Sequence, residues 1–147
     1  MMELYFHDLS AFEDIEIDEH GLFGYKYLDP YWTDDNRHPF LVRVEGKLAG
    51  FVLVNQHTFL PGSEYAIAEF FILRKYRRQR IGKTVACRIF DMFVGQWESH
   101  QTIENKIAQQ FWRKVVEGYT HGRYSECETM DRGFKKVIQS FRSERLQ

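Results

Sequence analysis

The strongest chemical signal in this 147-residue chain is a cluster of cations around one glycine. Six positive charges fall within ten positions, and Gly82 lies among them. The six are Arg74, Lys75, Arg77, Arg78, Arg80 and Lys83. Cations this close repel one another unless an anion binds between them. Nucleic acid, a phosphorylated cofactor or an acidic partner would each supply that anion, and charge alone does not choose among the three.

The cations lie between a predicted strand and a predicted helix. A loop that opens a helix exposes unpaired backbone N–H groups and the positive end of the helix dipole, where phosphates bind readily. Gly82 lets a ligand approach the main chain closely, and the arginines add charge-assisted hydrogen bonds. Gly82-Lys83-Thr84 is similar to the end of a nucleotide-triphosphatase P-loop, but that motif needs a glycine where this chain has Arg77. We therefore reject the P-loop interpretation.

Glu69 is the second candidate for chemistry. It is the only charged residue from Tyr65 to Leu73, a segment that is otherwise apolar or aromatic. A carboxylate among such neighbours loses solvation, which raises its pKa and makes it a better general base. The alternative is a structural glutamate that pairs with a nearby arginine.

Hydrophobic periodicity predicts the elements that position these residues. The predicted helices cover residues 3–12, 81–93 and 107–117, the last ending at Gly118 as its C-terminal cap. The predicted strands cover residues 40–44, 49–54, 65–73, 97–102, 119–130 and 137–141. The run 65–73 is typical of a strand buried on both faces. This order indicates one α/β domain over residues 1–147, built around a mixed sheet.

Composition limits the class of protein. Hydrophobic residues make up 44% of the chain and the formal net charge is −1, so the chain is globular rather than disordered. No apolar run reaches the about 18 residues of a membrane-spanning helix, and the first residues lack a secretory signal. Cys87 and Cys127 form neither a disulfide framework nor a zinc site, and the histidines show no metal spacing. We therefore expect a cytoplasmic protein without a metal.

The turn from Arg77 to Gly82, with the strand before it and the helix after it, resembles the acetyl-CoA signature of the GNAT N-acetyltransferase superfamily. The usual pattern is Arg or Gln, two residues, Gly, one residue, then Gly or Ala. Arg80 replaces the middle glycine, which leaves the turn tighter and more cationic. A second block, Glu104-Asn105-x-x-Ala108-x-x-Phe111-Trp112, resembles the second cofactor helix of the family.

With the hairpin over residues 40–54, this resemblance covers about residues 39–120, and the whole chain is similar to a bacterial group of predicted acetyltransferases. The resemblance implies a central mixed sheet flanked by helices, an α+β variant of the α/β class. The family usually opens with a strand before its first helix, and only about three residues precede Leu4 here. Either that strand is absent, or residues 1–12 are assigned wrongly. Its absence would expose a sheet edge that a second copy of the chain could cover. A homodimer is therefore one expectation.

The resemblance also implies acetyl-CoA as co-substrate, held by a defined set of residues. The pantetheine arm would bond to the strand backbone at residues 71–73 like an added strand. Residues 79–84 would surround the pyrophosphate, and one of Arg74, Lys75 and Arg78 would meet the adenosine phosphate. The implied cofactor-binding residues are Phe71, Ile72, Leu73, Arg77, Arg78, Gln79, Arg80, Ile81, Gly82, Lys83, Thr84, Asn105 and Trp112.

The implied reaction is direct acetyl transfer to an amine, with Glu69 as general base because many relatives keep a glutamate there. Relatives often aim a tyrosine at the sulfur from the position after Phe111. This chain has Trp112 there, and an indole cannot act as that acid. Tyr119 and Tyr124 are alternative acids. A mechanism without an acid is a further alternative, because a thiolate leaves readily near neutral pH.

The N-terminal region is implied to close over the acceptor. Residues 1–36 carry ten acidic side chains against one lysine, a formal charge of −9, which would favour a cationic amine. The aromatic residues from 23 to 32 would divide between the core and the wall of the acceptor pocket. Two other functions stay open: a non-catalytic acyl-CoA-binding or regulatory domain, and a nucleic-acid-binding module. The last is disfavoured, because the cations form one short turn and the sequence pI is about 6.6.

Overall fold

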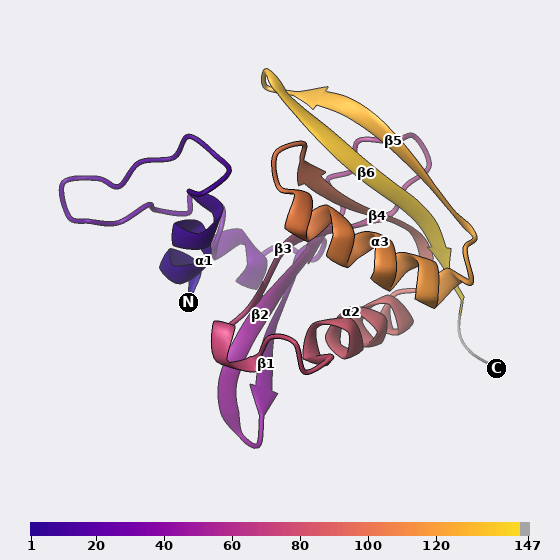
Figure 1. Ribbon diagram of the computed structural model, residues 1–147, viewed down its shortest axis with the longest axis horizontal. Coiled ribbons are helices and arrows are strands. Elements are labelled where there is room, and N and C mark those ends of the chain that lie inside the picture. Colours follow the sequence, from indigo (N-terminus) through magenta and orange to yellow (C-terminus); the bar gives the residue numbers. More distant parts are fainter. Residues whose placement is uncertain (145–147) are drawn as a thin grey trace.

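The fold is described from a computed structural model that defines residues 1–144 (Figure 1). These residues form a six-stranded sheet in the order β1-β2-β3-β4-β6-β5. The strands are β1 (His38–Val44), β2 (Lys47–Asn55), β3 (Tyr65–Ile72), β4 (Gly95–Thr102), β5 (Tyr124–Asp131) and β6 (Phe134–Ser143). The α-helices are α1 (Met2–Leu9), α2 (Ile81–Met92) and α3 (Lys106–Thr120), and 3-10 turns cover Asp29–Trp32 and Arg74–Tyr76. The pair β3–β4 is parallel and the other pairs are antiparallel, which confirms the expected mixed sheet.

Two hydrophobic clusters lie on opposite faces of this sheet. Helices α2 and α3 cover the larger cluster, which contains Phe90, Trp97 and Phe141. Helix α1 and the segment that follows it cover the smaller one, which contains Tyr31 and Phe71. Strand β3 contributes buried residues to both clusters, so the prediction of a strand buried on both faces is confirmed.

Local chemistry explains several element boundaries. The β1–β2 hairpin turns at Glu45 and Gly46, both with positive φ, as the favoured two-residue hairpin turns require. Helix α1 ends at Leu9, three residues before the predicted end, and turns follow it. The structure also extends β6 to residues 134–143 and begins β5 only at Tyr124.

The prediction that α3 ends at Gly118 is wrong. The helix continues to Thr120, and His121 takes the left-handed conformation that closes it. Gly122 follows with positive φ and donates its N–H to the carbonyl of Glu117. At Gly118 a Cβ atom would lie 3.5 Å from Nζ of Lys83, an ordinary van der Waals distance, so neither a cap nor close packing requires glycine at this position.

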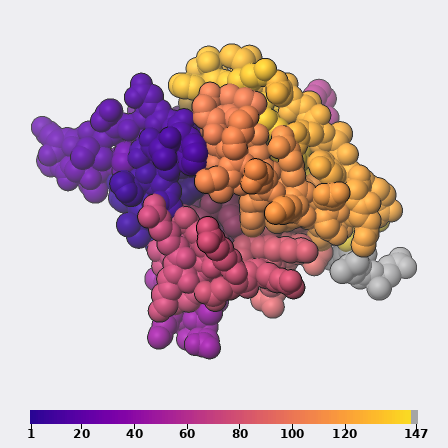
Figure 2. Space-filling model, in the orientation of Figure 1, coloured from indigo at the N-terminus to yellow at the C-terminus, as the bar shows by residue number. Residues whose placement is uncertain are grey.

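The N-terminal residues form an arm instead of an edge strand. Among residues 1–144 no strand precedes α1, and β1 is left at one edge of the sheet. The segment after α1 projects away from the sheet in the ribbon view and forms the indigo-to-violet protrusion of the space-filling view (Figures 1 and 2). Within the described residues, no helix is both long and apolar enough to cross a membrane.

Candidate active site

Strands β3 and β4 pair over a short distance and then separate. Their parallel register contains only the pairs Tyr65–Trp97, Ala66–Glu98 and Ile67–Ser99. Beyond Ile67, the edge of β3 that faces β4 has no ladder partner up to Ile72. Backbone N–H and C=O groups left in this way need other partners. The divergence therefore creates an open wedge where an extended ligand can pair with β3.

A β-bulge sets the direction of Glu69 at this wedge. On β2, Leu53 pairs with Glu69 but the next residue pairs with Ile67, so Ala68 is an extra residue on β3. The bulge reverses the alternation of side chains: Ile67 packs under α2 and α3, whereas Phe71 packs under α1. Glu69 consequently shares the face of Phe71 and points toward the N-terminal arm.

A cavity of about 430 Å³ occupies the wedge. Its walls come from α1 and the arm, from the start of α3, and from the diverging ends of β3 and β4. The β5–β6 turn closes the far side with Asp131, Arg132 and Lys136. Glu69 lies in this cavity together with Tyr5, Tyr25 and Asn105.

The environment of Glu69 matches that of a general base. Burial raises the pKa of its carboxyl to about 7, while hydrogen bonding by the hydroxyls of Tyr5 and Tyr25 works in the opposite direction. Nearby Glu13 also raises this pKa, and Lys136 lowers it. No arginine or lysine forms an ion pair with Glu69 among residues 1–144. Within the described residues, Glu69 is therefore not the structural glutamate paired with an arginine that the alternative required.

The opposite wall of the cavity carries a neutral imidazole. Burial, followed by the charge of Lys136, lowers the pKa of His100 to about 4. Lys136 forms an ion pair with Asp131 at 3.0 Å, and Phe59 stands edge-on to the His100 ring with a centroid distance of 5.1 Å. His100 is thus an uncharged polar group at neutral pH.

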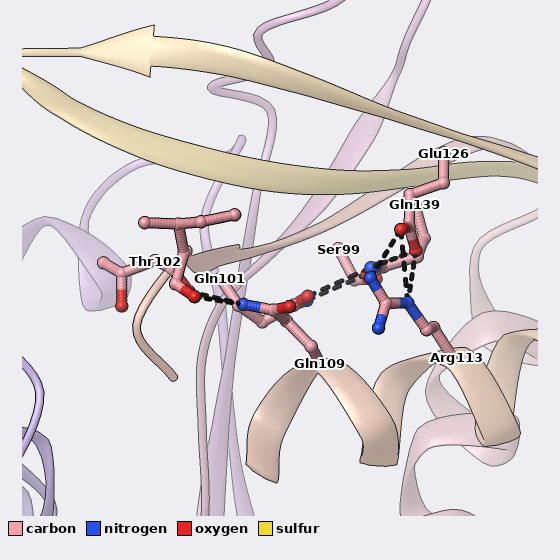
Figure 3. Close-up of polar contacts among 8 residues, drawn as sticks. Ser99, Gln101, Thr102, Gln109, Arg113, Glu126 and Gln139 are labelled. Carbon is pink, nitrogen blue, oxygen red and sulfur yellow. Dashed lines mark hydrogen bonds and ion pairs between the residues drawn. The ribbon is translucent and has the colours of Figure 1, made fainter. Parts of the chain in front are cut away.

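A buried polar network holds β4 below the cavity (Figure 3). The amide oxygen of Gln139 accepts hydrogen bonds from Ser99 and Gln101 at 2.8 and 2.9 Å, and its nitrogen donates to Gln101 and Glu126. Arg113 extends the network from α3 with a 2.6 Å contact to Glu126. Satisfied networks of this kind stiffen a protein interior. This network fixes the strand that diverges from β3.

The second predicted cofactor block begins α3 at the edge of the same cavity. The nitrogen of Gln109 donates to the carbonyls of Thr102 and Ile103, which ties α3 to the end of β4. Asn105 caps the helix by accepting from the N–H of Ala108 at 3.0 Å. Trp112 lines the cavity and packs edge-on to Phe70, 5.0 Å between ring centroids. The two residues predicted in this block therefore meet Glu69 in one site.

The predicted phosphate turn leads from β3 into α2. Arg78 and Arg80 both have φ of 61°, and Arg80 is the residue before the helix. Arg80 thus adopts the left-handed conformation that glycine favours, at a cost of about 1–2 kcal/mol for a residue with a side chain. At Gly82 a Cβ atom would lie 3.1 Å from Phe111, so this glycine is also required by the packing of α2 on α3.

The cations of this turn divide into two groups. Arg77 donates to Asp8 at 2.6 Å and to the carbonyl of Ile72 at 2.7 Å, and Arg74 donates to Asp8 at 2.7 Å. These two guanidinium groups bind helix α1 to the turn. The other four, Lys75, Arg78, Arg80 and Lys83, are exposed at the turn and the start of α2. Among the described residues, none of these four forms an ion pair with a carboxylate.

Tyr119 lies elsewhere. Its hydroxyl donates to Asp91 at 2.8 Å, and burial with this bond raises its pKa. It lines a separate open cavity of about 770 Å³ between α2, α3 and the end of β6, which shares no residue with the Glu69 cavity. Tyr124 packs against the larger core and does not line the Glu69 cavity. The structure therefore does not bring either predicted acid to Glu69.

Tyr5 and Tyr25, which the sequence did not assign to catalysis, line the cavity together with Glu69. The expectation for the aromatic segment 23–32 pointed to Tyr25 alone: Tyr25 lines the cavity, and Tyr31 of the same segment is in the smaller core. Among residues 1–144, no group of three or more histidines, cysteines and acidic residues could hold a metal ion.

A family model supplies the assignment that the geometry suggests. The model of the GNAT acetyltransferase family matches residues 2–116. This chain belongs to that family. No curated protein matches it by sequence.

Solved GNAT structures share the fold at low sequence identity. An acetyltransferase from Thermus thermophilus superposes with a TM-score of 0.69 and 13% identity, covering 96% of this chain and 88% of its own. An N-acetyltransferase from Staphylococcus aureus gives 0.68 and 10%, with coverage of 95% and 93%. A putative streptothricin acetyltransferase from Bacillus anthracis, in complex with acetyl coenzyme A, gives 0.60 and 11%, with coverage of 79% and 68%. The resemblance inferred from the turn and the second block is thereby confirmed, and with it the expected GNAT-like fold.

Proposed function

We propose that this chain is an acetyl-CoA-dependent N-acetyltransferase that transfers acetyl directly to a primary amine bound beside Glu69. One observation carries the proposal: a largely buried carboxyl with a pKa of about 7 faces a cavity at the point where β3 and β4 diverge. A base with a pKa near the working pH combines a useful ionised fraction with strong proton affinity.

The chain offers a complementary surface for acetyl-CoA. The free edge of β3 up to Ile72 would bond the pantetheine arm, as strand addition does. Arg78, Arg80 and Lys83, with the N–H groups that open α2, would hold the phosphates. The bound co-substrate supplies an activated acetyl thioester, so the protein has no bond to activate covalently.

Glu69 would take the proton that the acceptor ammonium must lose before its nitrogen can attack. The nitrogen lone pair then forms the C–N bond, the C–S bond breaks, and the sulfur leaves with that electron pair as a thiolate. The nitrogen, which is positively charged after the attack, releases its second proton to the thiolate or to water and becomes the neutral amide. The hydroxyl of Tyr119 donates a hydrogen bond to Asp91 in another cavity. We therefore propose that the thiolate leaves without a proton from Tyr119.

The acceptor would carry a positive charge beside the reacting amine. Of the ten acidic residues in 1–36, nine do not line the cavity; among these, Asp8 binds two arginines and Glu3 accepts from the N–H of Phe23. Glu13 is the exception: it lines the cavity near Glu69, and burial raises its pKa. The preference for a cationic amine therefore depends on Glu13 rather than on net charge.

Calorimetric titration with acetyl-CoA, coenzyme A and ATP tests the cofactor site. We expect micromolar binding of the two coenzyme A species and none of ATP. Arg80→Glu should weaken that binding at least tenfold, because it places a negative charge at the turn, whereas Arg88→Glu on the exposed part of α2 should not. Equal affinity in both variants would show that the phosphates bind elsewhere.

Release of free thiol in the presence of an amine panel tests the reaction itself. The panel contains diamines, amino acids, aminoglycosides and lysine peptides. Turnover with any of them supports the transferase, and diamines should lose the most when Glu13 is replaced by glutamine. Tight acetyl-CoA binding with no turnover on any amine would favour the non-catalytic acyl-CoA-binding domain.

A further inference from the structure

The wall of the Glu69 cavity contains a buried hydroxyl that has no partner. Oγ1 of Thr102 is removed from solvent, and among residues 1–144 it takes part in no hydrogen bond. The backbone carbonyl of the same residue is satisfied, since it accepts from Gln109 at 2.9 Å and from the N–H of Asn105 at 3.1 Å. Buried polar side-chain atoms are nearly always hydrogen-bonded in folded proteins. Because Thr102 lines the cavity, a ligand bound in the cavity can supply the missing partner.

Strand geometry places Thr102 on the same face of the sheet as Glu69. The register of β4 with β6 runs without a shift over the whole of β4. Trp97 belongs to the cluster under α2 and α3, so the alternation of side chains directs His100 and Thr102 to the opposite face. Glu69 lies on that opposite face, and all three line the same cavity. Thr102 and His100 therefore stand across the wedge from Glu69.

Two further polar groups accompany the Thr102 hydroxyl in this wall. The neutral imidazole of His100 has one nitrogen that donates and one that accepts. Asn105 uses its side-chain oxygen to cap α3 by accepting from the N–H of Ala108, so its amide nitrogen keeps its hydrogens to donate. The three residues come from one continuous segment, the end of β4 and the start of α3.

The cation opposite Thr102 is already paired. Lys136 is the partner of Thr102 in the register of β4 with β6. Its ammonium forms an ion pair with Asp131 at 3.0 Å and lies over the ring of Phe59 at 5.3 Å. Lys136 therefore does not require an anionic group on the ligand, and the wall around Thr102 favours a neutral polar group.

A hydroxyl group has the hydrogen-bonding capacity that this wall requires. The Thr102 hydroxyl and the neutral His100 ring can each donate and accept, and a ligand hydroxyl can do both in return. An ammonium group only donates and a carboxylate only accepts. Either charged group would therefore leave part of the wall without a partner.

We propose that Thr102 is a specificity-determining residue which, with His100 and Asn105, binds a hydroxyl group of the acceptor. The acceptor is then a hydroxylated amine, such as an amino alcohol or an amino sugar. This proposal deepens the proposed function and rests on it for the transfer step. Glu13 meets the cationic group and Thr102 meets the hydroxyl of the same molecule.

The test compares amines that differ only by a hydroxyl group: diaminopropane with diaminopropanol, and lysine with hydroxylysine. Calorimetry measures the affinity of the protein for each amine, with and without coenzyme A. Thiol release from acetyl-CoA measures kcat/KM for the same amines. We expect the hydroxylated member of at least one pair to be favoured at least about tenfold, because its analogue leaves the polar groups of the wall unpaired.

Three variants assign this preference to the Thr102 hydroxyl. Thr102→Val removes the hydroxyl but keeps the backbone carbonyl that binds α3, so the preference should be lost. Thr102→Ser keeps a hydroxyl and should retain the preference. Thr129→Val is the matched control, because Thr129 lies on strand β5 and does not line the cavity.

Binding and turnover fail separately in this experiment. A parent protein that binds neither amine of either pair, or binds both members of each pair equally, would overturn the hydroxyl site. An unchanged preference in Thr102→Val, or its loss in Thr102→Ser, would also overturn it. The expected preference in binding without thiol release would retain the hydroxyl site and reject the transferase. Turnover with no preference within either pair would retain the transferase and reject the hydroxyl site.

Discussion

Two glutamates on neighbouring strands are removed from water but held in different ways. Glu98 on β4 is fully buried and accepts the backbone N–H groups of Phe59 and Leu60 at 2.9 and 2.7 Å. Glu69 on β3 faces a cavity, and its partners are side-chain hydroxyls from the N-terminal arm.

The difference separates a structural carboxylate from one suited to chemistry. Backbone donors cannot rotate away, and they bind the loop that carries Phe59 to the sheet. The polar groups that share the cavity with Glu69 include the side chains of Tyr5 and Tyr25, which can rotate, and the carboxyl itself faces the cavity. Burial penalises the charge at this site enough to bring the pKa of Glu69 to about 7. The same substitution at the two positions should therefore have opposite consequences.

The largest expected effect is on the reaction. Glu69→Gln should lower the transfer rate at least about 100-fold, because the amide cannot accept the proton of the amine. Affinity for acetyl-CoA should stay within about twofold. The rate is measured by thiol release with the best amine of the panel, and the affinity by calorimetry. The exposed Glu117→Gln is the control, and a Glu69→Gln rate equal to that control would remove Glu69 from the mechanism.

The next effect is on stability at the other carboxylate. Glu98→Gln should reduce the free energy of unfolding by about 3 kcal/mol, since its amide nitrogen would face an N–H donor and leave a buried donor unpaired. Chemical denaturation of this variant beside Glu117→Gln measures the loss. A loss no greater than that of the control would mean that water replaces the carboxylate.

The opposite sign is expected for the stability of Glu69→Gln. The pKa of Glu69 is about 7 in the folded chain against 4.5 for a free side chain, so the folded state holds its proton more tightly. The stability that protonated Glu69 contributes to the parent protein is fully present below pH 4.5, the pKa of a free side chain. It is lost as the pH rises through about 7, the pKa in the folded chain. Glutamine carries no such charge, so the variant should gain about 2 kcal/mol over the parent at about pH 8 and almost nothing near pH 4. A stability difference that does not vary with pH would contradict the elevated pKa.

The cationic turn before α2 and the Glu69 site differ in how far the sequence predicts them. The phosphate turn is local: its cations and Gly82 follow one another, so spacing alone predicts a loop that opens a helix. Glu69 is recognisable as one charge in an apolar strand. The bulge at Ala68, which turns Glu69 toward the arm, leaves no mark in the hydrophobic pattern.

The partners of Glu69 could not be predicted because they are distant along the chain. Tyr5 and Tyr25 precede it by more than 40 positions and Lys136 follows it by more than 60, and only the tertiary fold brings them together. Tyr119 shows the reverse case, since it follows the second block closely in sequence but packs into another cavity. Gly118 led to a wrong helix end, because the helix continues past this glycine to Thr120 and His121 closes it.

A third carboxylate provides the smallest test of the comparison. Asp8 on α1 is partly exposed; burial opposes its charge, but hydrogen bonds from Arg77 and Arg74 lower its pKa below the usual 3.8. Asp8→Asn should cost about 1 kcal/mol of stability near neutral pH, in the range of partly exposed ion pairs.

The stability that Asp8 contributes changes with pH in the opposite direction to that of Glu69. A carboxylate whose pKa is lowered by folding stabilises the folded chain at pH values above its pKa in the unfolded chain. This stabilisation is lost as the pH falls through its pKa in the folded chain. The difference in stability between the parent and Asp8→Asn should therefore shrink as the pH falls below the usual 3.8 of an aspartate, whereas the exposed Asp14→Asn should match the parent throughout. Because Asp8 joins α1 to the phosphate turn, the variant should also loosen the helix that carries Tyr5. Hydrogen exchange of the α1 amides would then increase, and unchanged exchange would show that packing of Tyr5 against Phe51 is sufficient to hold α1.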